Sequence, residues 1–148
     1  MNERIKDESM NEVQQVHFTQ TRKLIAKYKG REIKTIGDSF MVVFRSVEKA
    51  LDFARTLQSN TGNAHVQIRA GIHIGSMQVT ENDVFGETVN FASRVLGLIT
   101  EAEIWISERA REDIDRFGAD HHRCFNWKRH DGMKLKGFAG EFTLWSIE

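Results

Sequence analysis

A short hairpin between two helix-like segments constrains the fold of this chain most. Residues 32–36 and 40–44 are rich in β-branched and aromatic residues, and Gly37-Asp38-Ser39 between them has turn chemistry. Residues 8–29 instead repeat their apolar side chains at helical spacing, and Ser46 is suited to cap a second helix after the hairpin. The pattern predicts a helix, a hairpin and a helix in succession.

The rest of the chain continues to alternate between helical and extended patterns. We expect helices at residues 87–99 and 107–114, and strands at residues 65–74, 77–80, 103–106, 124–127 and 141–147. Because a hairpin interrupts the alternation, we expect an α/β (α+β) fold of the ferredoxin-like sandwich kind, not a doubly wound sheet. Its helices would pack on a mostly antiparallel sheet. No linker or internal repeat is visible, so residues 1–148 are interpreted as a single domain.

The composition is that of one globular domain and excludes several classes of protein. The 148 residues are 40% hydrophobic and 28% charged, within the globular range. Lys plus Arg and Asp plus Glu both total 21, so zero net charge argues against nucleic acid or an anionic membrane as a partner. The chain has no apolar run of about 18 residues, no signal-peptide pattern, and one cysteine, Cys124. These features predict a cytoplasmic location without an intrachain disulfide.

Three polar features have residue types suited to phosphate chemistry. Asp38 lies at the hairpin tip beside a glycine, where a carboxylate can approach a divalent cation, although aspartate also simply suits turns. Asn90 and Arg94 lie one helical turn apart and could hold a phosphate and a sugar or ring oxygen, or form an ordinary solvated face. Alternation places Lys134 and Lys136 on one face of a strand, where they could equally be two surface lysines.

Other familiar site patterns are weak or missing. Both G-x-x-x-x-G-K-[ST] and G-x-G-x-x-G are absent. The set of His121, His122, Cys124 and His130 suggests zinc, but adjacent histidines on a strand point to opposite faces and no C-x-x-C is present. We therefore expect no metal site among these four residues.

Taken together, the hairpin, the polar helix face and the C-terminal lysine resemble one known family. The segments are GREIKTIGDSFMVVF (30–44), VQIRAGIHIG (66–75), DVFGETVNFASRV (83–95) and LKGFAGEFTLW (135–145). With these segments in this order, the chain resembles the class III adenylate/guanylate cyclase catalytic domain, of the adenylate-specific type, over residues 8–148. The G-G-D/E-E-F signature of diguanylate cyclases is absent, as is an RNP1-like strand for RNA binding.

The resemblance implies a reaction, cofactors and a partner. ATP would be converted to cyclic AMP and pyrophosphate with two Mg²⁺ or Mn²⁺ ions, at sites on the interface of a head-to-tail homodimer. The implied roles are metal binding by Asp38, adenine reading by Lys34 and Asp83, transition-state stabilisation by Asn90 and Arg94, and triphosphate binding by Lys136. A parent protein could add a regulatory domain or a membrane tether.

One departure from the family pattern concerns the N-terminus. The family domain opens with a strand of the form F-x-D-I-x-G-[FS]-T that carries a first metal aspartate, and residues 1–7 do not supply it. We therefore expect an N-terminally truncated domain without the first strand of the family fold, with unpaired edges on the neighbouring strands. With one of two metal aspartates, the 148-residue chain would form little cyclic AMP. The alternative is a non-catalytic cyclase-like module for dimerisation or nucleotide binding, which metal-dependent turnover would distinguish.

Overall fold

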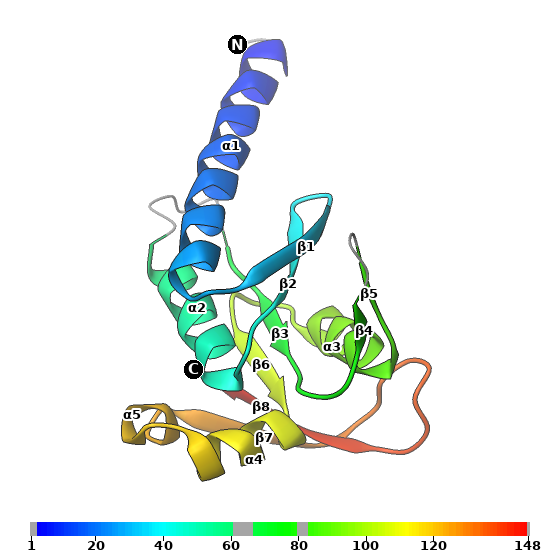
Figure 1. Ribbon diagram of the computed structural model, residues 1–148. Coiled ribbons are helices and arrows are strands. Elements are labelled where there is room, and N and C mark those ends of the chain that lie inside the picture. Colours follow the sequence, from blue (N-terminus) through cyan, green and yellow to red (C-terminus); the bar gives the residue numbers. More distant parts are fainter. Residues whose placement is uncertain (1–2, 61–66, 80–82, 148) are drawn as a thin grey trace.

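The N-terminal part of the chain folds into the expected helix, hairpin and helix. A computed structural model describes residues 3–60, 67–79 and 83–147 of the chain (Figure 1). Its first elements are α1 (Glu3–Lys27), β1 (Arg31–Ile36), β2 (Ser39–Val43) and α2 (Val47–Ser59). Ser46 caps α2 as expected, because its side chain accepts a hydrogen bond from the Lys49 amide at 3.2 Å.

The hairpin turn is tighter than the sequence pattern suggested. Ile36 pairs with Ser39, so the loop contains only Gly37 and Asp38, and Ser39 belongs to β2. Gly37 has a φ of 62°, and glycine with positive φ at the first loop position is typical of a type II′ turn, whose twist matches the flanking strands. The turn thus presents Asp38 at an exposed tip.

In the part of the chain that the structure describes, the main sheet has four strands and is mostly antiparallel, as expected. Its order is β3-β6-β8-β7, and only the β3–β6 pair is parallel. The bounds are β3 (Ala70–Ile72), β6 (Ile104–Ser107), β7 (Trp127–Met133) and β8 (Phe142–Ile147). The hairpin β1–β2 and the short pair β4 (Gln78–Val79) and β5 (Val84–Phe85) form separate sheets. Within the described residues, β2 pairs with β1 and β3 pairs with β6.

The helices cover both faces of the main sheet. Ile104 and Ile106 of β6 pack with buried residues of α2 and of α4 (Glu108–Phe117), whereas Trp105 between them packs towards α3 (Glu87–Leu98). This alternation follows from the two-residue period of a strand. Figure 1 shows α1 extending well away from the body that these layers form. None of the helices in the described ranges combines the length and apolar character needed to cross a lipid bilayer.

Two expected strands differ from the structure. The strand expected at residues 65–74 is found at Ala70–Ile72, and residues 65 and 66 lie outside the described residues. The strand expected at residues 124–127 begins only at Trp127, the first residue of β7, because a helical turn, α5 (Asp120–Arg123), leads to Cys124, whose amide donates to the Asp120 carbonyl at 3.0 Å. The Trp127 indole nitrogen also donates to the His122 carbonyl at 2.9 Å. These local hydrogen bonds favour a turn over an extended segment.

Gly71 of β3 sets the distance between the sheet and α3. A Cβ atom at this position would lie 2.9 Å from the Ala92 carbonyl oxygen and 2.9 Å from the Leu96 amide nitrogen, which are backbone atoms of α3. Gly71→Ala is therefore expected to displace α3 and to lower the free energy of unfolding by about 1–3 kcal/mol. Gly97, inside α3, has no atom within 4 Å of the corresponding position, so Gly97→Ala is expected to stabilise by up to about 1 kcal/mol. Urea unfolding measures both changes, and equal stability of the two variants would contradict this packing.

Candidate active site

The structure brings Lys34 and Asp83 together although they are 49 residues apart in the chain. Lys34 lies on β1 and Asp83 directly precedes β5, and the Lys34 Nζ atom is 2.9 Å from each carboxylate oxygen of Asp83. The Lys34 side chain is 37% exposed and the Asp83 side chain is 26% exposed, so both are accessible to a ligand. An ammonium group only donates hydrogen bonds and an ionised carboxylate only accepts them. The pair therefore offers one donor and one acceptor side by side.

Asn90 and Arg94 lie one turn apart on the exposed side of α3. The other side of this helix is held by Val95, which is fully buried, and by Phe91. The Phe91 ring lies edge-on to two other phenylalanine rings, with its centroid 5.3 Å from that of Phe138 and 5.2 Å from that of Phe142. Because these contacts fix the inner side of α3, the Asn90 amide and the Arg94 guanidinium are held on its exposed side.

Lys136 lies in the loop between β7 and β8, and Asp38 lies in the turn between β1 and β2. Residues 134–141 connect β7 to β8 and are not a strand, so the expected shared strand face of Lys134 and Lys136 is wrong. Instead, the Phe138 amide donates to the carbonyl of the buried Leu135 at 3.0 Å, and Gly137 has a φ of 87°. A positive φ at this position is typical of a type II turn, which leaves Lys136 exposed at the turn.

Titratable groups next to these elements are perturbed by burial. Burial lowers the pKa of His17 on α1, and the nearby Asp38 carboxylate partly opposes that shift. Burial also lowers the pKa of His73, and the positive charge of Arg109 acts in the same direction. His73 Nδ1 lies 2.7 Å from the Ser107 hydroxyl, and its ring centroid is 4.3 Å from that of Phe91. A neutral His73 therefore helps to fix the inner side of α3.

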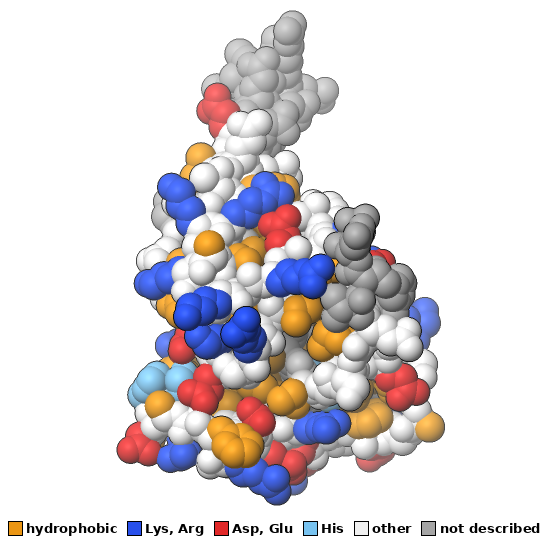
Figure 2. Space-filling model, in the orientation of Figure 1, with side chains coloured by type: hydrophobic (Ala, Val, Ile, Leu, Met, Phe, Trp, Pro, Cys, Tyr) orange, Lys and Arg blue, Asp and Glu red, His pale blue; other side chains and the backbone are white. Residues whose placement is uncertain are grey.

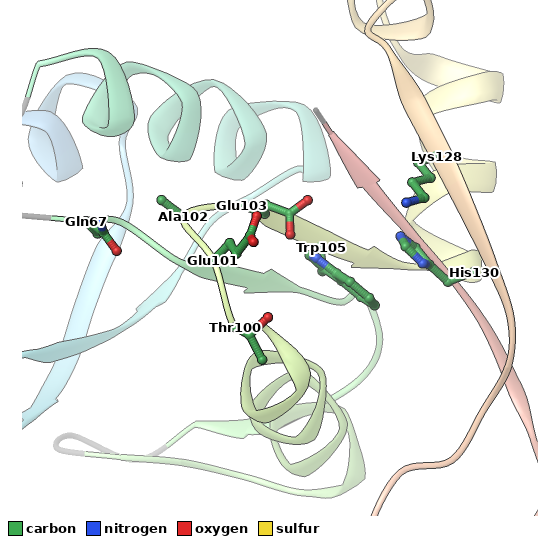
Figure 3. A pocket seen from close by; sticks show the side chains of 8 residues that line it. All are labelled: Gln67, Thr100, Glu101, Ala102, Glu103, Trp105, Lys128 and His130. Atoms are coloured by element: carbon green, nitrogen blue, oxygen red, sulfur yellow. The ribbon is translucent and has the colours of Figure 1, made fainter.

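A separate hollow of about 940 Å³ lies beside β6 and β7 (Figure 3). In it, the Trp105 ring stacks on His130, with ring centroids 4.1 Å apart and an angle of 16° between the planes. Sequence reasoning missed this hollow, because it depends on the pairing of distant segments. None of the six residues that the sequence predicted for the active site lines it; the lining residues are Gln67, Thr100, Glu101, Ala102, Glu103, Trp105, Lys128 and His130.

Known proteins resemble this chain both in sequence and in fold. A pH-sensitive adenylate cyclase of Mycobacterium tuberculosis is 32% identical over 117 residues, covering 78% of this chain and 29% of that protein. An adenylate cyclase of Streptomyces coelicolor is 27% identical over 115 residues, covering 76% of this chain and 30% of that protein. The crystal structure of an adenylate/guanylate cyclase/hydrolase from Silicibacter pomeroyi superposes with a TM-score of 0.80 at 22% identity, covering 96% of this chain and 84% of that chain.

The family assignment rests on a match along the whole sequence. The chain spans less than a third of the length of these two curated relatives. The family described as the adenylate and guanylate cyclase catalytic domain matches residues 1–148. This chain therefore belongs to the adenylate and guanylate cyclase catalytic domain family.

Proposed function

We propose that this domain converts ATP to 3′,5′-cyclic AMP and pyrophosphate. The observation that carries the choice of ATP is the Lys34–Asp83 pair, whose donor and acceptor suit the N1 atom and the 6-amino group of adenine. Family membership and the names of the two relatives, both adenylate cyclases, support the same reaction. Figure 2 shows positive and negative side chains interspersed over the visible body, which suits a small-molecule substrate better than a polyanion.

The exposed polar residues can perform the charge stabilisation that this reaction needs. The ribose 3′-hydroxyl attacks the α-phosphorus in line, and such transfers depend on positioning and charge neutralisation more than on covalent help. Arg94 would meet the charge that develops around the α-phosphoryl group, with Asn90 holding a ribose oxygen one turn away. Lys136, exposed at its turn, would bind the terminal phosphates.

Asp38 fits the role of a ligand for a divalent cation. Its carboxylate is exposed at the tip of a two-residue turn, beside a glycine without a side chain, and oxygen ligands of this type are preferred by Mg²⁺ and Mn²⁺. When bound, such an ion, one of two in the proposed mechanism, would neutralise phosphate charge and favour ionisation of the attacking hydroxyl. In this chain Asp38 supplies one carboxylate for that purpose.

We further propose a head-to-tail homodimer in which each site combines two protomers. One protomer would supply Asp38, and its partner would supply the Lys34–Asp83 pair together with Asn90 and Arg94. The exposure of Asp38, Asn90 and Arg94 in the single chain supports this arrangement. A two-fold dimer would then hold two equivalent sites.

Mixing two impaired variants tests the composite site. The assay uses an extended chain, in which the 148 residues are preceded by a strand that carries the family's first metal aspartate. Asp38→Ala and Arg94→Ala are each expected to keep about a hundredth of the activity or less when assayed alone. Their mixture should recover about a quarter of the original activity, because about half of the dimers are mixed and each mixed dimer has one intact site. Cyclic AMP formation with Mg²⁺ or Mn²⁺ is the measurement.

The control for this experiment mixes Lys34→Ala with Arg94→Ala. Both residues come from the same protomer in each proposed site, so every mixed dimer carries a lesion in both sites and activity should not recover. Equal recovery in the two mixtures would contradict the assignment of residues to protomers. If the unmodified extended chain forms no cyclic AMP with either metal, the proposed activity is wrong and the non-catalytic alternative is favoured.

A further inference from the structure

A group of metal-ligating side chains lies between α2 and α5, on elements that the proposed reaction does not use. Asp52 comes from α2, and His121 and His122 come from α5. One ligand atom from each of the three lies within 4.8 Å of the others. The two histidine rings are close, with centroids 3.9 Å apart, because residues 120–123 form a helical turn. The expectation that their side chains point to opposite faces of a strand is therefore wrong.

His122 is the buried centre of this group and has one unsatisfied ring nitrogen. The residue is 2% exposed. Its Nε2 atom lies 2.8 Å from an Asp52 carboxylate oxygen, whereas its Nδ1 atom is buried without a hydrogen-bond partner. Glu48, one helical turn before Asp52, places a carboxylate oxygen 3.7 Å from that nitrogen. Two carboxylates thus face one buried imidazole, and a buried nitrogen without a partner is costly.

Contacts around α5 fix the position of the two histidines. The Trp127 indole nitrogen donates to the His122 carbonyl at 2.9 Å, and the His122 amide donates to the Ala119 carbonyl at 3.0 Å. The Phe125 ring lies edge-on to both histidine rings, with centroids 6.2 and 5.9 Å away. A metal site needs such support, because ligands that are held in place lose little conformational freedom on binding.

We propose that Asp52, His121 and His122 bind a borderline transition-metal ion such as Zn²⁺. Two imidazole nitrogens and a carboxylate oxygen form a donor set that favours Zn²⁺ over Mg²⁺, and a four-coordinate ion would complete its shell with water. Glu48 faces the other ring nitrogen of His122, Nδ1, and would orient that ring. On binding, Asp52 would exchange its hydrogen bond to His122 for a bond to the metal. The ion would join α5 to α2, at a place separate from the Asp38 tip of the hairpin.

Zinc titration of the 148-residue chain without an affinity tag tests the site. Calorimetry of the chain is expected to show Zn²⁺ binding that His121→Gln weakens at least about tenfold, since even residues that only support metal ligands change affinity by about 10–100-fold. His121 is exposed, so this substitution should leave the fold intact. His130→Gln is the matched control, because His130 lies on β7 against Trp105, and it should bind Zn²⁺ as the original chain does.

Thermal unfolding provides a second measurement. Zn²⁺ should raise the Tm of the original chain and of His130→Gln, because a ligand that binds only the folded state stabilises it, and should raise that of His121→Gln much less. Millimolar Mg²⁺ should not reproduce the shift. Absence of Zn²⁺ binding by the original chain, or equal binding and equal Tm shifts for His121→Gln, would overturn the proposal.

Discussion

Arg94→Ala is expected to lower kcat of the extended chain by about 10²–10³ while changing KM much less. In the proposed reaction, the guanidinium contact strengthens only as charge builds around the α-phosphoryl group, and losing one donor of this kind typically costs that factor in rate. Such a contact contributes to the transition state and not to ground-state binding. Asn90→Ala, one turn earlier on the same exposed face, should act in the same direction.

Steady-state kinetics and thermal unfolding together separate this role from a structural one. Arg94 is exposed on α3, so its removal should leave Tm nearly unchanged. Arg116→Ala is the matched control, because Arg116 is exposed in the last turn of α4 and α4 packs on the opposite face of the sheet. A change in KM alone would show that Arg94 only binds substrate, and a large fall in Tm would show that it supports the fold.

Local sequence patterns predicted the elements whose structure depends on nearby residues. The hairpin followed from strand-forming runs around Gly37 and Asp38, and the start of α2 followed from the capping preference of Ser46. The exposed pair on α3 followed from helical spacing. Each of these features is decided by residues within about one turn of one another, where backbone preference and hydrogen bonding act directly.

Features that depend on distant contacts could not be predicted in the same way. The turn at α5 is held partly by the Trp127 side chain, and the Asp52–His122 contact joins residues 70 positions apart. Without this tertiary information, the two aromatic residues within residues 124–127 favoured a strand over the whole segment. Likewise, the place of Lys136 in a turn depends on the burial of Leu135 against the sheet.

Only part of the candidate site could be predicted from the sequence. Spacing identified Asn90 with Arg94, but nothing in the residues between Lys34 and Asp83 indicates that these two meet. Their association in the cyclase family suggested the pair, and the structure places the two side chains in direct contact. Residue spacing along one element is visible in a sequence, whereas proximity across elements requires the fold or a resemblance.

The Lys34–Asp83 pair leads to a prediction about the substrate base. Lys34 has three donor hydrogens and Asp83 has several acceptor sites, so both can contact a base while they remain paired with each other. Adenine offers an N1 acceptor beside a 6-amino donor, which matches this arrangement. Guanine offers an N1 hydrogen and an O6 acceptor, so Lys34 would face a donor, or Asp83 an acceptor, at the same positions. Sites that bind a substrate through such hydrogen bonds discriminate between two substrates by up to about 10⁴–10⁵-fold in kcat/KM.

We therefore expect the extended chain to prefer ATP over GTP in kcat/KM by several orders of magnitude, up to about 10⁴-fold. Lys34→Glu should lower kcat/KM for ATP and shift the ratio towards GTP, because a carboxylate at this position accepts a hydrogen bond from the guanine N1 and repels the adenine N1 lone pair. Lys23→Glu is the charge-matched control, since Lys23 is exposed on α1, and it should keep the original ratio. Comparable turnover of ATP and GTP by the extended chain without substitutions, or an unchanged ratio in Lys34→Glu, would show that this pair does not read the base.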